Sequence, residues 1–343
     1  MVQKSDRHPE CSEGSRLLQD GGFFMNWAEL PRPILGLAPM VDVTNGAFRL
    51  VCCEGGADVV FAEMMVAEAV LHALERMRSR LTILEGERPV VFQITGKDVN
   101  NIKLAASRLY EEFTPNGFDI NMACPAKTAL KGNYGARLLE DAAKAAEIVR
   151  VVKEAAPIPI SIKIRRLSAE GTDNTVEFVQ KMVAAGAELV TVHGRTHSQH
   201  YETSADWGLV DAVARAVDVP VLGTGDMTSP QKITKFLQRY PAVAGALVAR
   251  GAIGAPWIFE QTKQLLGTGK EPEFLPWAER VPVIKRHAEL MRELFGERSI
   301  LPFRKHLAKY VAEIPNSKPL RDKLVRMESY EGLYELLDAE VVQ

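Results

Sequence analysis

Residues 219–251, VPVLGTGDMTSPQKITKFLQRYPAVAGALVARG, decide the fold, because two short apolar runs here flank one helical pattern. The runs VPVLGTG (219–225) and GALVARG (245–251) are nearly continuous in apolar residues, which is typical of parallel strands buried on both faces. Between them, SPQKITKFLQRY (229–240) has helical apolar spacing and opens on Ser229, a good N-cap residue. A strand, a helix and a second buried strand form the repeating unit of a parallel α/β fold.

The same unit repeats along the preceding chain. Six further runs predict strands: ILGLAPM (34–40), DVVFAEM (58–64), PVVFQIT (89–95), FDINMAC (118–124), IPISIKI (158–164) and ELVTVHG (188–194). Helices are predicted at VNNIKLAASRLYEEF (99–113), AAKAAEIVRVVKEA (142–155) and TVEFVQKMVAAG (175–186), with Asp98 and Asp141 as N-caps of the first two. Eight alternating strands predict an α/β protein with a (β/α)8 TIM barrel over residues 33–262, and a doubly wound open sheet is the alternative.

The barrel pattern is flanked by two segments of different character. Residues 1–26 are polar, without periodicity or a signal-peptide core, and predict a disordered N-terminal tail. After a connection rich in Gly and Pro (265–276), helical spacing predicts a small C-terminal all-helical domain over 277–343. Residues 280–326 hold 12 Lys/Arg against 5 Asp/Glu, although the whole chain has a net charge of −2. This segment is either a surface for a polyanion or a solvated helical face.

Composition narrows the class of protein further. No apolar run approaches the roughly 18 residues of a membrane span, so we expect no membrane partner. The four cysteines lack CxxC spacing, which favours a reducing compartment, and we expect a cytoplasmic protein. Cys52 and Cys53 lie in a helical pattern and are interpreted as packing residues.

Polar residues end almost every predicted strand, and TIM barrels build their active sites from these C-terminal strand ends. Lys163 ends the strand IPISIKI. It would form a Schiff base, offer a positive charge to an electron-rich cofactor, or simply extend its amine from the strand end into water. The sequence leaves these three interpretations open.

Cys124 ends the run FDINM and is followed by proline and a basic, Gly-rich segment. One interpretation is an acid or nucleophile at the barrel mouth, and the other is a small buried core residue. Lys127, Lys131 and Arg137 follow, with glycines between them. Such a flexible basic loop would bind an anion or stabilise a thiolate, which favours the functional interpretation.

Two further strand ends indicate an anion rather than a metal. His193 precedes Arg195, His197 and His200, but no carboxylate or cysteine lies at a compatible ligand spacing, so we expect no metal. The loops after strands seven and eight are glycine-rich and include Arg250. TIM barrels frequently bind a phosphate at these two loops.

These motifs together resemble the tRNA-dihydrouridine synthase family, most nearly its bacterial B-type branch. The matching stretches are LAPMVDVTNGAFR (37–49), FQITG (92–96), DINMACPAK (119–127), KGNYGARLL (131–139), SIKIR (161–165), VTVHGRT (190–196), GTGDM (223–227), ARGAIGAPWIF (249–259) and, in the helical domain, FRKH (303–306). The resemblance implies an enzyme that reduces the C5–C6 double bond of uridines in tRNA, with bound FMN and with NADPH or NADH as the reductant. We also expect a monomer.

The resemblance assigns roles to individual residues. Cys124 would be the general acid. FMN would lie against Ala38, Pro39, Met40, Gln93, Lys163, His193, Thr224, Gly225, Asp226, Ala249 and Arg250. Substrate contacts would come from Asn121, Lys127, Arg137, Arg165, Arg195, Arg304 and Lys305, with residues 277–343 as the tRNA-binding domain and 33–262 as the FMN-binding domain.

Three departures from the family pattern and two rival functions remain. Ala123, Thr224 and Ala249 stand where the family usually has Gly, Asn and Gly, and the last two would weaken FMN binding. One rival is an FMN barrel acting on a free pyrimidine, which would not need a basic helical domain. The other is a non-catalytic tRNA-binding protein, which would not need Cys124, Lys163 and His193.

Overall fold

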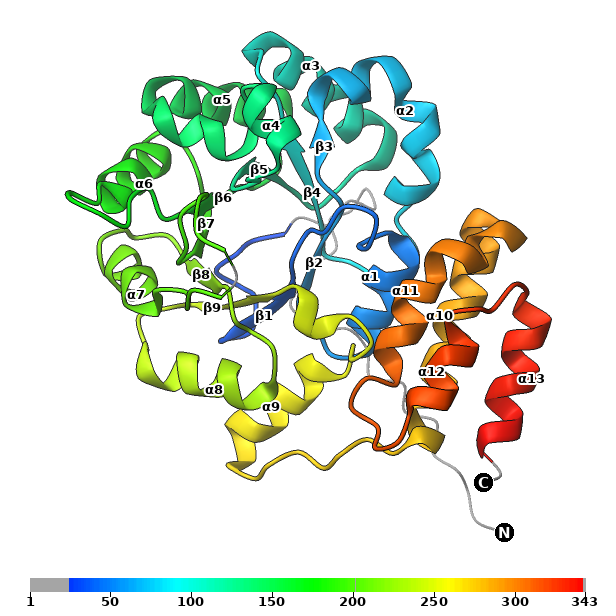
Figure 1. Cartoon of the computed structure of the whole chain (residues 1–343). Coiled ribbons are helices and arrows are strands. Elements are labelled where there is room, and N and C mark those ends of the chain that lie inside the picture. Colours follow the sequence, from blue (N-terminus) through cyan, green and yellow to red (C-terminus); the bar gives the residue numbers. More distant parts are fainter. Residues whose placement is uncertain (1–24, 201, 342–343) are drawn as a thin grey trace.

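The structure is a computed structural model that describes residues 25–200 and 202–341, and it shows a closed parallel β-barrel ringed by helices (Figure 1). The eight barrel strands are β1 (Ile34–Leu37), β2 (Val59–Phe61), β4 (Val90–Thr95), β5 (Gly117–Met122), β6 (Ile160–Arg165), β7 (Leu189–His193), β8 (Val221–Thr224) and β9 (Gly245–Val248). Strand β1 pairs with β9, and β2 pairs with β4, so the sheet closes on itself. The predicted TIM barrel is confirmed, and the open sheet was the wrong alternative.

One short strand was not predicted. The run DVVFAEM was expected as a single strand, but β2 ends at Phe61 and the chain resumes pairing only in β3 (Met65–Val66), which extends the ladder of β4. The break between the two strands contains Glu63, whose side chain is almost fully buried. The chain therefore bends at the barrel mouth and carries a carboxylate there.

The barrel helices follow the predicted pattern. They are α1 (Gly46–Glu54), α2 (Ala67–Leu81), α3 (Val99–Phe113), α5 (Ala142–Ala155), α6 (Thr175–Ala184), α7 (Trp207–Arg215), α8 (Pro230–Arg239) and α9 (Ile258–Thr268). The predicted N-caps are confirmed, because Asp98, Asp141 and Ser229 each accept a hydrogen bond from the backbone N–H three residues on. Cys52 and Cys53 are buried on α1, as their interpretation as packing residues predicts.

The basic segment after Cys124 is not the flexible loop that was expected. It forms the short helix α4 (Lys127–Lys131) and the 3₁₀ helix η1 (Gly135–Glu140). Gly135 has φ +63°, and a Cβ there would lie 2.8 Å from the carbonyl oxygen of Cys124. Glycine is required at this position for both reasons, and it allows the segment to pack closely on the catalytic candidate.

The helical domain shares a core with the barrel. It consists of α10 (Trp277–Phe295), η3 (Glu297–Ser299), α11 (Ile300–Tyr310), α12 (Lys318–Leu324) and α13 (Tyr330–Val341). Ala47, Leu50 and Val51 of α1 belong to the same buried cluster as Ile284 and Leu307 of this domain. Figure 1 shows α10 and α11 beside α1. The two parts therefore pack through an apolar interface rather than through a flexible tether.

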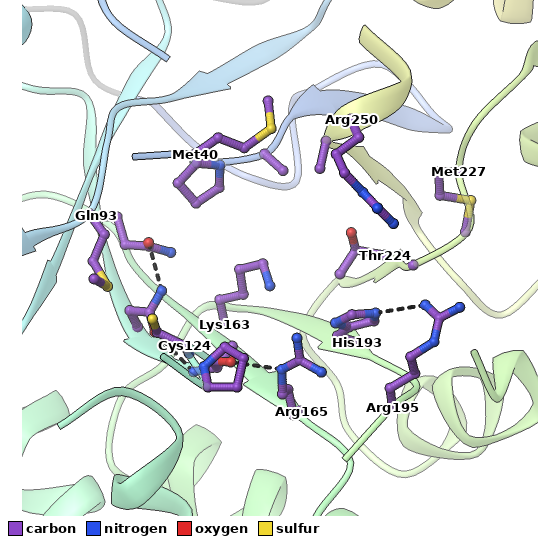
Figure 2. Close-up of a pocket in the computed structure, with 18 of the residues that line it drawn as sticks. Met40, Gln93, Cys124, Lys163, Arg165, His193, Arg195, Thr224, Met227 and Arg250 are labelled. Atoms are coloured by element: carbon purple, nitrogen blue, oxygen red, sulfur yellow. Dashed lines mark hydrogen bonds between the residues drawn. The ribbon is translucent and has the colours of Figure 1, made fainter. Parts of the chain in front are cut away.

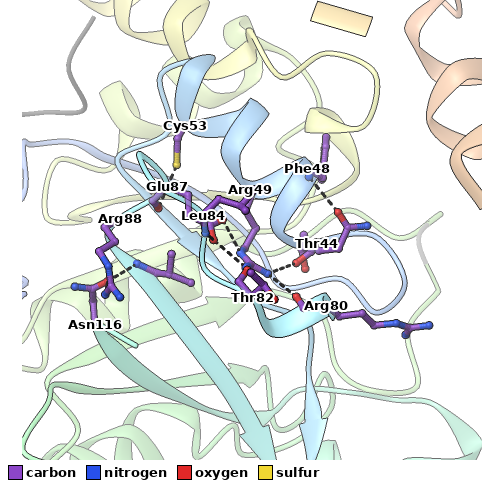
Figure 3. A network of polar contacts seen from close by, with 12 residues as sticks. Thr44, Phe48, Arg49, Cys53, Arg80, Thr82, Leu84, Glu87, Arg88 and Asn116 are labelled. Atoms are coloured by element: carbon purple, nitrogen blue, oxygen red, sulfur yellow. Dashed lines mark hydrogen bonds and ion pairs between the residues drawn. The ribbon is translucent and has the colours of Figure 1, made fainter. Parts of the chain in front are cut away.

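A buried ion pair joins α1 to the segment between α2 and β4 (Figure 3). The Arg49 and Glu87 side chains are fully enclosed and lie 3.1 Å apart. Arg49 also donates to the carbonyl oxygens of Thr44, Arg80 and Thr82. These contacts satisfy the guanidinium and fix the end of α2 against the start of α1.

The opposite end of the barrel is plugged. Trp27 and Leu30 pack into a cluster with strand residues, and Trp27 stacks on Phe61 with ring centroids 6.4 Å apart. Met25 is buried in the same cluster, while residues 1–24 of the predicted tail lie outside the described residues. The open end of the barrel is thus the C-terminal end of its strands.

Among residues 25–200 and 202–341, no helix combines the length and the apolar character that a membrane span needs.

Candidate active site

A cavity of about 270 Å³ opens at the C-terminal ends of the strands (Figure 2). Most of the predicted site residues line it: Ala38, Pro39, Met40, Gln93, Asn121, Cys124, Lys163, Arg165, His193, Arg195, Thr224, Gly225, Asp226, Ala249 and Arg250. These residues come from seven of the eight barrel strands or the loops after them, so only the closed barrel brings them together.

A chain of hydrogen bonds crosses three neighbouring strands at the cavity floor. Gln93 Nε2 donates to Asp119 Oδ2 at 2.6 Å, and Ser161 Oγ donates to Asp119 Oδ1 at 2.7 Å. Because an ionised carboxylate only accepts hydrogen bonds, Gln93 must turn its amide nitrogen toward Asp119. Its oxygen then accepts from Asn121 Nδ2 at 2.8 Å. The orientation of both amides follows from the one carboxylate.

The same chain fixes the turn that carries Cys124. Asn121 Oδ1 accepts from the backbone N–H groups of Ala123 and Cys124 at 3.0 and 2.9 Å. The carbonyl of Cys124 accepts from Ala136 at 3.0 Å. The Thr95 hydroxyl donates to the Asn121 carbonyl at 3.0 Å. The half-buried thiol therefore stands at the cavity wall on a backbone that is held from both sides.

Sequence reasoning missed Asp119 and Ser161. Asp119 is completely buried, and burial raises the pKa of its carboxyl group against the opposing effect of its hydrogen bonds from Gln93 and Ser161. The available signal was a carboxylate in the middle of FDINM, a run that otherwise suits a buried strand. A buried carboxylate needs donors on adjacent strands, and Gln93 and Ser161 are its register partners.

Cationic groups surround His193. Burial, followed by the charges of Lys163, Arg165, Arg195 and Arg250, lowers the pKa of His193 to about 2, so the imidazole is neutral. Burial and then Arg165 lower the pKa of Lys163 to about 8, while Asp119 and Cys124 act in the opposite direction. The cavity is therefore positively charged at neutral pH and suits an anionic ligand.

Two of these arginines brace the cavity wall. Arg165 donates to the carbonyls of Ala123 and Thr196 at 2.8 and 2.9 Å. Arg195 pairs with Asp226 at 2.5 Å. Both arginines are almost fully buried. They hold the ends of β5, β7 and β8 together, and their predicted contact with RNA stays a prediction.

The loops after β8 and β9 approach closely at the positions where a phosphate was expected. Gly225 has φ +102°, and a Cβ there would lie 2.6 Å from His193 Cδ2. At Gly251 a Cβ would lie 2.5 Å from the carbonyl oxygen of Met227. The Thr224 hydroxyl donates to the Leu247 carbonyl at 2.8 Å, so this departure from the family pattern is used within the sheet. Arg250 begins the short helix η2 (Arg250–Ala252) beside these glycines.

Four predicted substrate residues lie away from this cavity. Arg137 pairs with Glu140 at 2.7 Å on the exposed face of η1, and Lys127 begins α4. Arg304 donates to the Met327 carbonyl at 2.6 Å, and Lys305 donates to the Asp42 carbonyl. Their roles toward RNA stay predictions.

The basic helical segment is less basic than its composition indicates. Ion pairs join Arg286 to Glu54, Arg292 to Glu297 and Glu331, Lys285 to Asp338, and Lys323 to Glu340. The acidic helix α13 supplies three of these partners.

Within residues 25–200 and 202–341, no group of three or more His, Cys, Asp and Glu side chains could hold a metal ion.

Known proteins resemble this chain over most of its length. The family model described as Dihydrouridine synthase (Dus) matches residues 36–343. A "tRNA-dihydrouridine synthase B" of Pseudomonas aeruginosa is 34% identical over 301 residues, which cover 87% of this chain and 90% of that protein. A "Probable tRNA-dihydrouridine synthase" of Rickettsia conorii is 32% identical over 287 residues, covering 83% of this chain and 86% of that protein.

Solved structures support the fold alone. A histamine dehydrogenase from Rhizobium sp. 4-9 aligns with a TM-score of 0.53 at 17% identity, covering 75% of this chain and 49% of that one. An amine oxidase from Pseudomonas geniculata N1 aligns with a TM-score of 0.53 at 13% identity, covering 69% of this chain and 48% of that one. The chain thus spans about half the length of each. The match of the family model over residues 36–343 and the identity to two full-length relatives show that this chain belongs to the dihydrouridine synthase family.

Proposed function

We propose that this protein is a tRNA-dihydrouridine synthase that reduces the C5–C6 double bond of uridines in tRNA. FMN would be its cofactor, and NADPH or NADH its reductant. The observation that carries the proposal is the position of Cys124, which stands at the wall of a cationic cavity on a backbone fixed by Asn121. Family membership over nearly the whole chain supports the same activity.

The residues of the cavity fit a flavin with a phosphate tail. Gly225 and Gly251 let the loops after β8 and β9 pack against His193 and the Met227 carbonyl beside the cavity, and Arg250 adds a positive charge there. Gln93 and Asn121 offer oriented amide groups, and Lys163 offers an ammonium. A bound reduced flavin would supply the hydride for C6 of the uracil.

The chain itself must deliver a proton to C5. A thiol can donate a proton, and Cys124 brings a free thiol to the cavity. Lys163, protonated below a pH of about 8, stabilises negative charge that develops beside it. Gln93 and Asn121 would bind the ring edge of the flavin, with amide orientations that Asp119 fixes.

The uridine must leave its stack to enter a barrel mouth. Phosphates on either side would then lie over the surface near the helical domain. There Arg298, which forms no ion pair with the described residues, can bind them. A free pyrimidine would need none of this surface, which favours tRNA as the substrate.

The test is to map dihydrouridine in tRNA from a strain lacking this gene, before and after the gene is restored. We expect dihydrouridine to disappear at one or more defined positions and to return on complementation. Unchanged dihydrouridine at every position in the deletion strain would contradict the proposal. Reduction of free uracil or orotate by the purified protein would favour the rival flavin enzyme.

A further inference from the structure

A second cavity of about 460 Å³ lies at the junction between the barrel and the helical domain. The barrel contributes Asp42, Glu63 and Arg80, and the helical domain contributes Phe295, Arg298 and Pro302. None of these six residues lines the first cavity. The junction cavity exists only because the two parts of the chain pack together.

The two cavities are separated by a wall one residue thick. Val41 lines the first cavity and Asp42 the second, and likewise Met64 lines the first and Glu63 the second. Both pairs lie just beyond the ends of neighbouring strands β1 and β2. A ligand that fills the first cavity therefore has the junction cavity directly beside it.

Asp42 is held firmly in this wall. Its φ of +60° is a left-handed conformation that aspartate tolerates at some cost. Its N–H donates to Glu63 Oε2 at 2.7 Å, and its side chain accepts from Arg80 at 2.7 Å. Its carbonyl accepts from Lys305 of the helical domain. Contacts from both parts of the chain thus fix the wall between the cavities.

Glu63 brings a largely buried carboxylate to the junction cavity. Glu63 is only 6% exposed. Among the described residues, Oε2 accepts from the Asp42 N–H and lies 3.6 Å from Arg80, whereas Oε1 accepts no hydrogen bond. Burial is the main cause that raises the pKa of this carboxyl group, because these donors do not fully replace water. Further N–H donors would stabilise it.

The remaining walls suit a nucleotide. Phe295 and Pro302 give apolar surface on which a base can stack. Arg298 lies exposed on η3 and forms no ion pair with any described residue, so its guanidinium can bind a phosphate. Acceptor, stacking surface and cation therefore meet in one cavity.

We infer that the junction cavity binds the nucleotide next to the reduced uridine, and that Glu63 selects guanine there. This inference rests on the proposed function. Guanine presents two adjacent N–H donors, N1–H and N2–H, to a carboxylate, whereas adenine and cytosine present one amino group and uracil one imino group. Single-stranded bases in RNA are read in this way, by stacking and by hydrogen bonds to their Watson–Crick edges.

The test measures the Kd and kcat/KM of the full-length protein for substrate tRNAs. Each tRNA carries one substitution, at the nucleotide before or after the uridine that is to be reduced. Guanosine, inosine, adenosine and cytidine are compared at one salt concentration. At one flanking position we expect guanosine to bind about tenfold more tightly than adenosine, with inosine, which lacks the N2 amino group, between them. Glu63→Gln should abolish the difference between guanosine and inosine.

Arg298→Gln is the matched control. This substitution should weaken the binding of all of the tRNAs by a similar factor. It should also reduce the salt dependence of the tRNA affinity by the amount of about one phosphate contact. Equal Kd values for guanosine, inosine and adenosine in the unmodified protein would overturn the inference, as would a guanosine preference that survives Glu63→Gln in a variant with an unchanged melting temperature. If Glu63→Gln is unstable, the guanosine-to-inosine ratio of the unmodified protein decides alone. Because Kd needs no turnover, absence of dihydrouridine in every tRNA would count against the proposed function and not against this site.

Discussion

At the scale of the residue, Cys124 is positioned by its backbone. The hydrogen bonds described for it run from its N–H to Asn121 and from Ala136 to its carbonyl, while its sulfur faces the cavity. Asp119 fixes this arrangement through Gln93 and Asn121. The thiol can therefore be changed without disturbing the groups that place it.

Cys124→Ala should consequently fold and bind FMN like the unmodified protein. Dihydrouridine formation should fall by roughly 10²–10⁴, the usual contribution of a general acid. Dihydrouridine formation should fall similarly in Cys124→Ser, because a hydroxyl is a far weaker acid than a thiol. The rate of dihydrouridine formation in unmodified tRNA is the measurement, with flavin absorbance as the control for cofactor content. An unchanged rate would restore the interpretation of Cys124 as a packing residue.

Lys163 gives a pH dependence to anion binding. Its pKa is about 8 in the free protein, and a bound anion raises it further. The stabilisation by the ammonium is then complete below about pH 8 and is lost as pH rises through the bound-state pKa. FMN affinity should therefore decrease above pH 8, as measured by quenching of flavin fluorescence.

Asp119→Asn separates charge from hydrogen bonding in the same experiment. The carboxylate raises the pKa of Lys163, so its loss should move the decrease in FMN affinity to lower pH. Ser161→Ala keeps the carboxylate and should leave the midpoint nearly in place. An identical pH profile in Asp119→Asn and the unmodified protein would show that Asp119 does not act through Lys163.

The ends of the predicted strands located several residues that line the cavity, although their roles stay predictions. Gln93, Asn121, Cys124, Lys163 and His193 all line the cavity, as expected from their places at the ends of apolar runs. Asp119 and Ser161 could not be assigned, because their partnership depends on the register of β4, β5 and β6, which spacing within one strand does not reveal.

At the scale of the element, the alternation of strands and helices predicted the barrel because buried parallel strands are continuous in apolar residues. The segment 127–140 was predicted wrongly as a flexible loop. Its glycines were taken as a source of freedom, whereas Gly135 is needed for a left-handed turn packed against Cys124. Strand β3 was missed because two residues carry no periodic signal.

Arg250, the first residue of η2 after β9, can be tested at this scale. Arg250→Ala should weaken FMN binding by about 1.5–3 kcal/mol, the contribution of one charge-assisted hydrogen bond. That corresponds to roughly 10- to 150-fold in Kd. Equilibrium dialysis of the apo protein with FMN measures it, and riboflavin, which lacks the phosphate, is the control ligand. An equal loss for riboflavin would place the phosphate away from Arg250.

At the scale of the whole molecule, the helical domain has two roles. It covers α1, and it adds the surface that we expect to bind tRNA. Leu50 and Val51 of α1 are buried against it, and full burial of such side chains contributes about 1.5–3 kcal/mol each. A chain that ends after Thr268 should therefore aggregate or melt at a lower temperature, instead of leaving an intact barrel. Differential scanning calorimetry checks this, and a truncated barrel with an unchanged melting temperature would contradict it.

Full-length charge variants are consequently the better test of RNA binding. Composition predicted a strongly basic domain, but Glu54 and the acidic helix α13 neutralise part of it, which no count over residues 280–326 can show. The remaining cations should still make tRNA affinity fall steeply with salt, because bound counterions are released on binding. An affinity that does not change with salt would place the tRNA on another surface.

The most direct test of the account is single-turnover oxidation of the reduced, FMN-loaded protein, without oxygen, by tRNA that lacks dihydrouridine. We predict that flavin absorbance returns at a rate that depends on tRNA concentration, with one dihydrouridine formed for each flavin oxidised. The same rate should fall in Cys124→Ala. Oxidation by free uracil or orotate but not by tRNA, or no oxidation by any of them, would contradict the account.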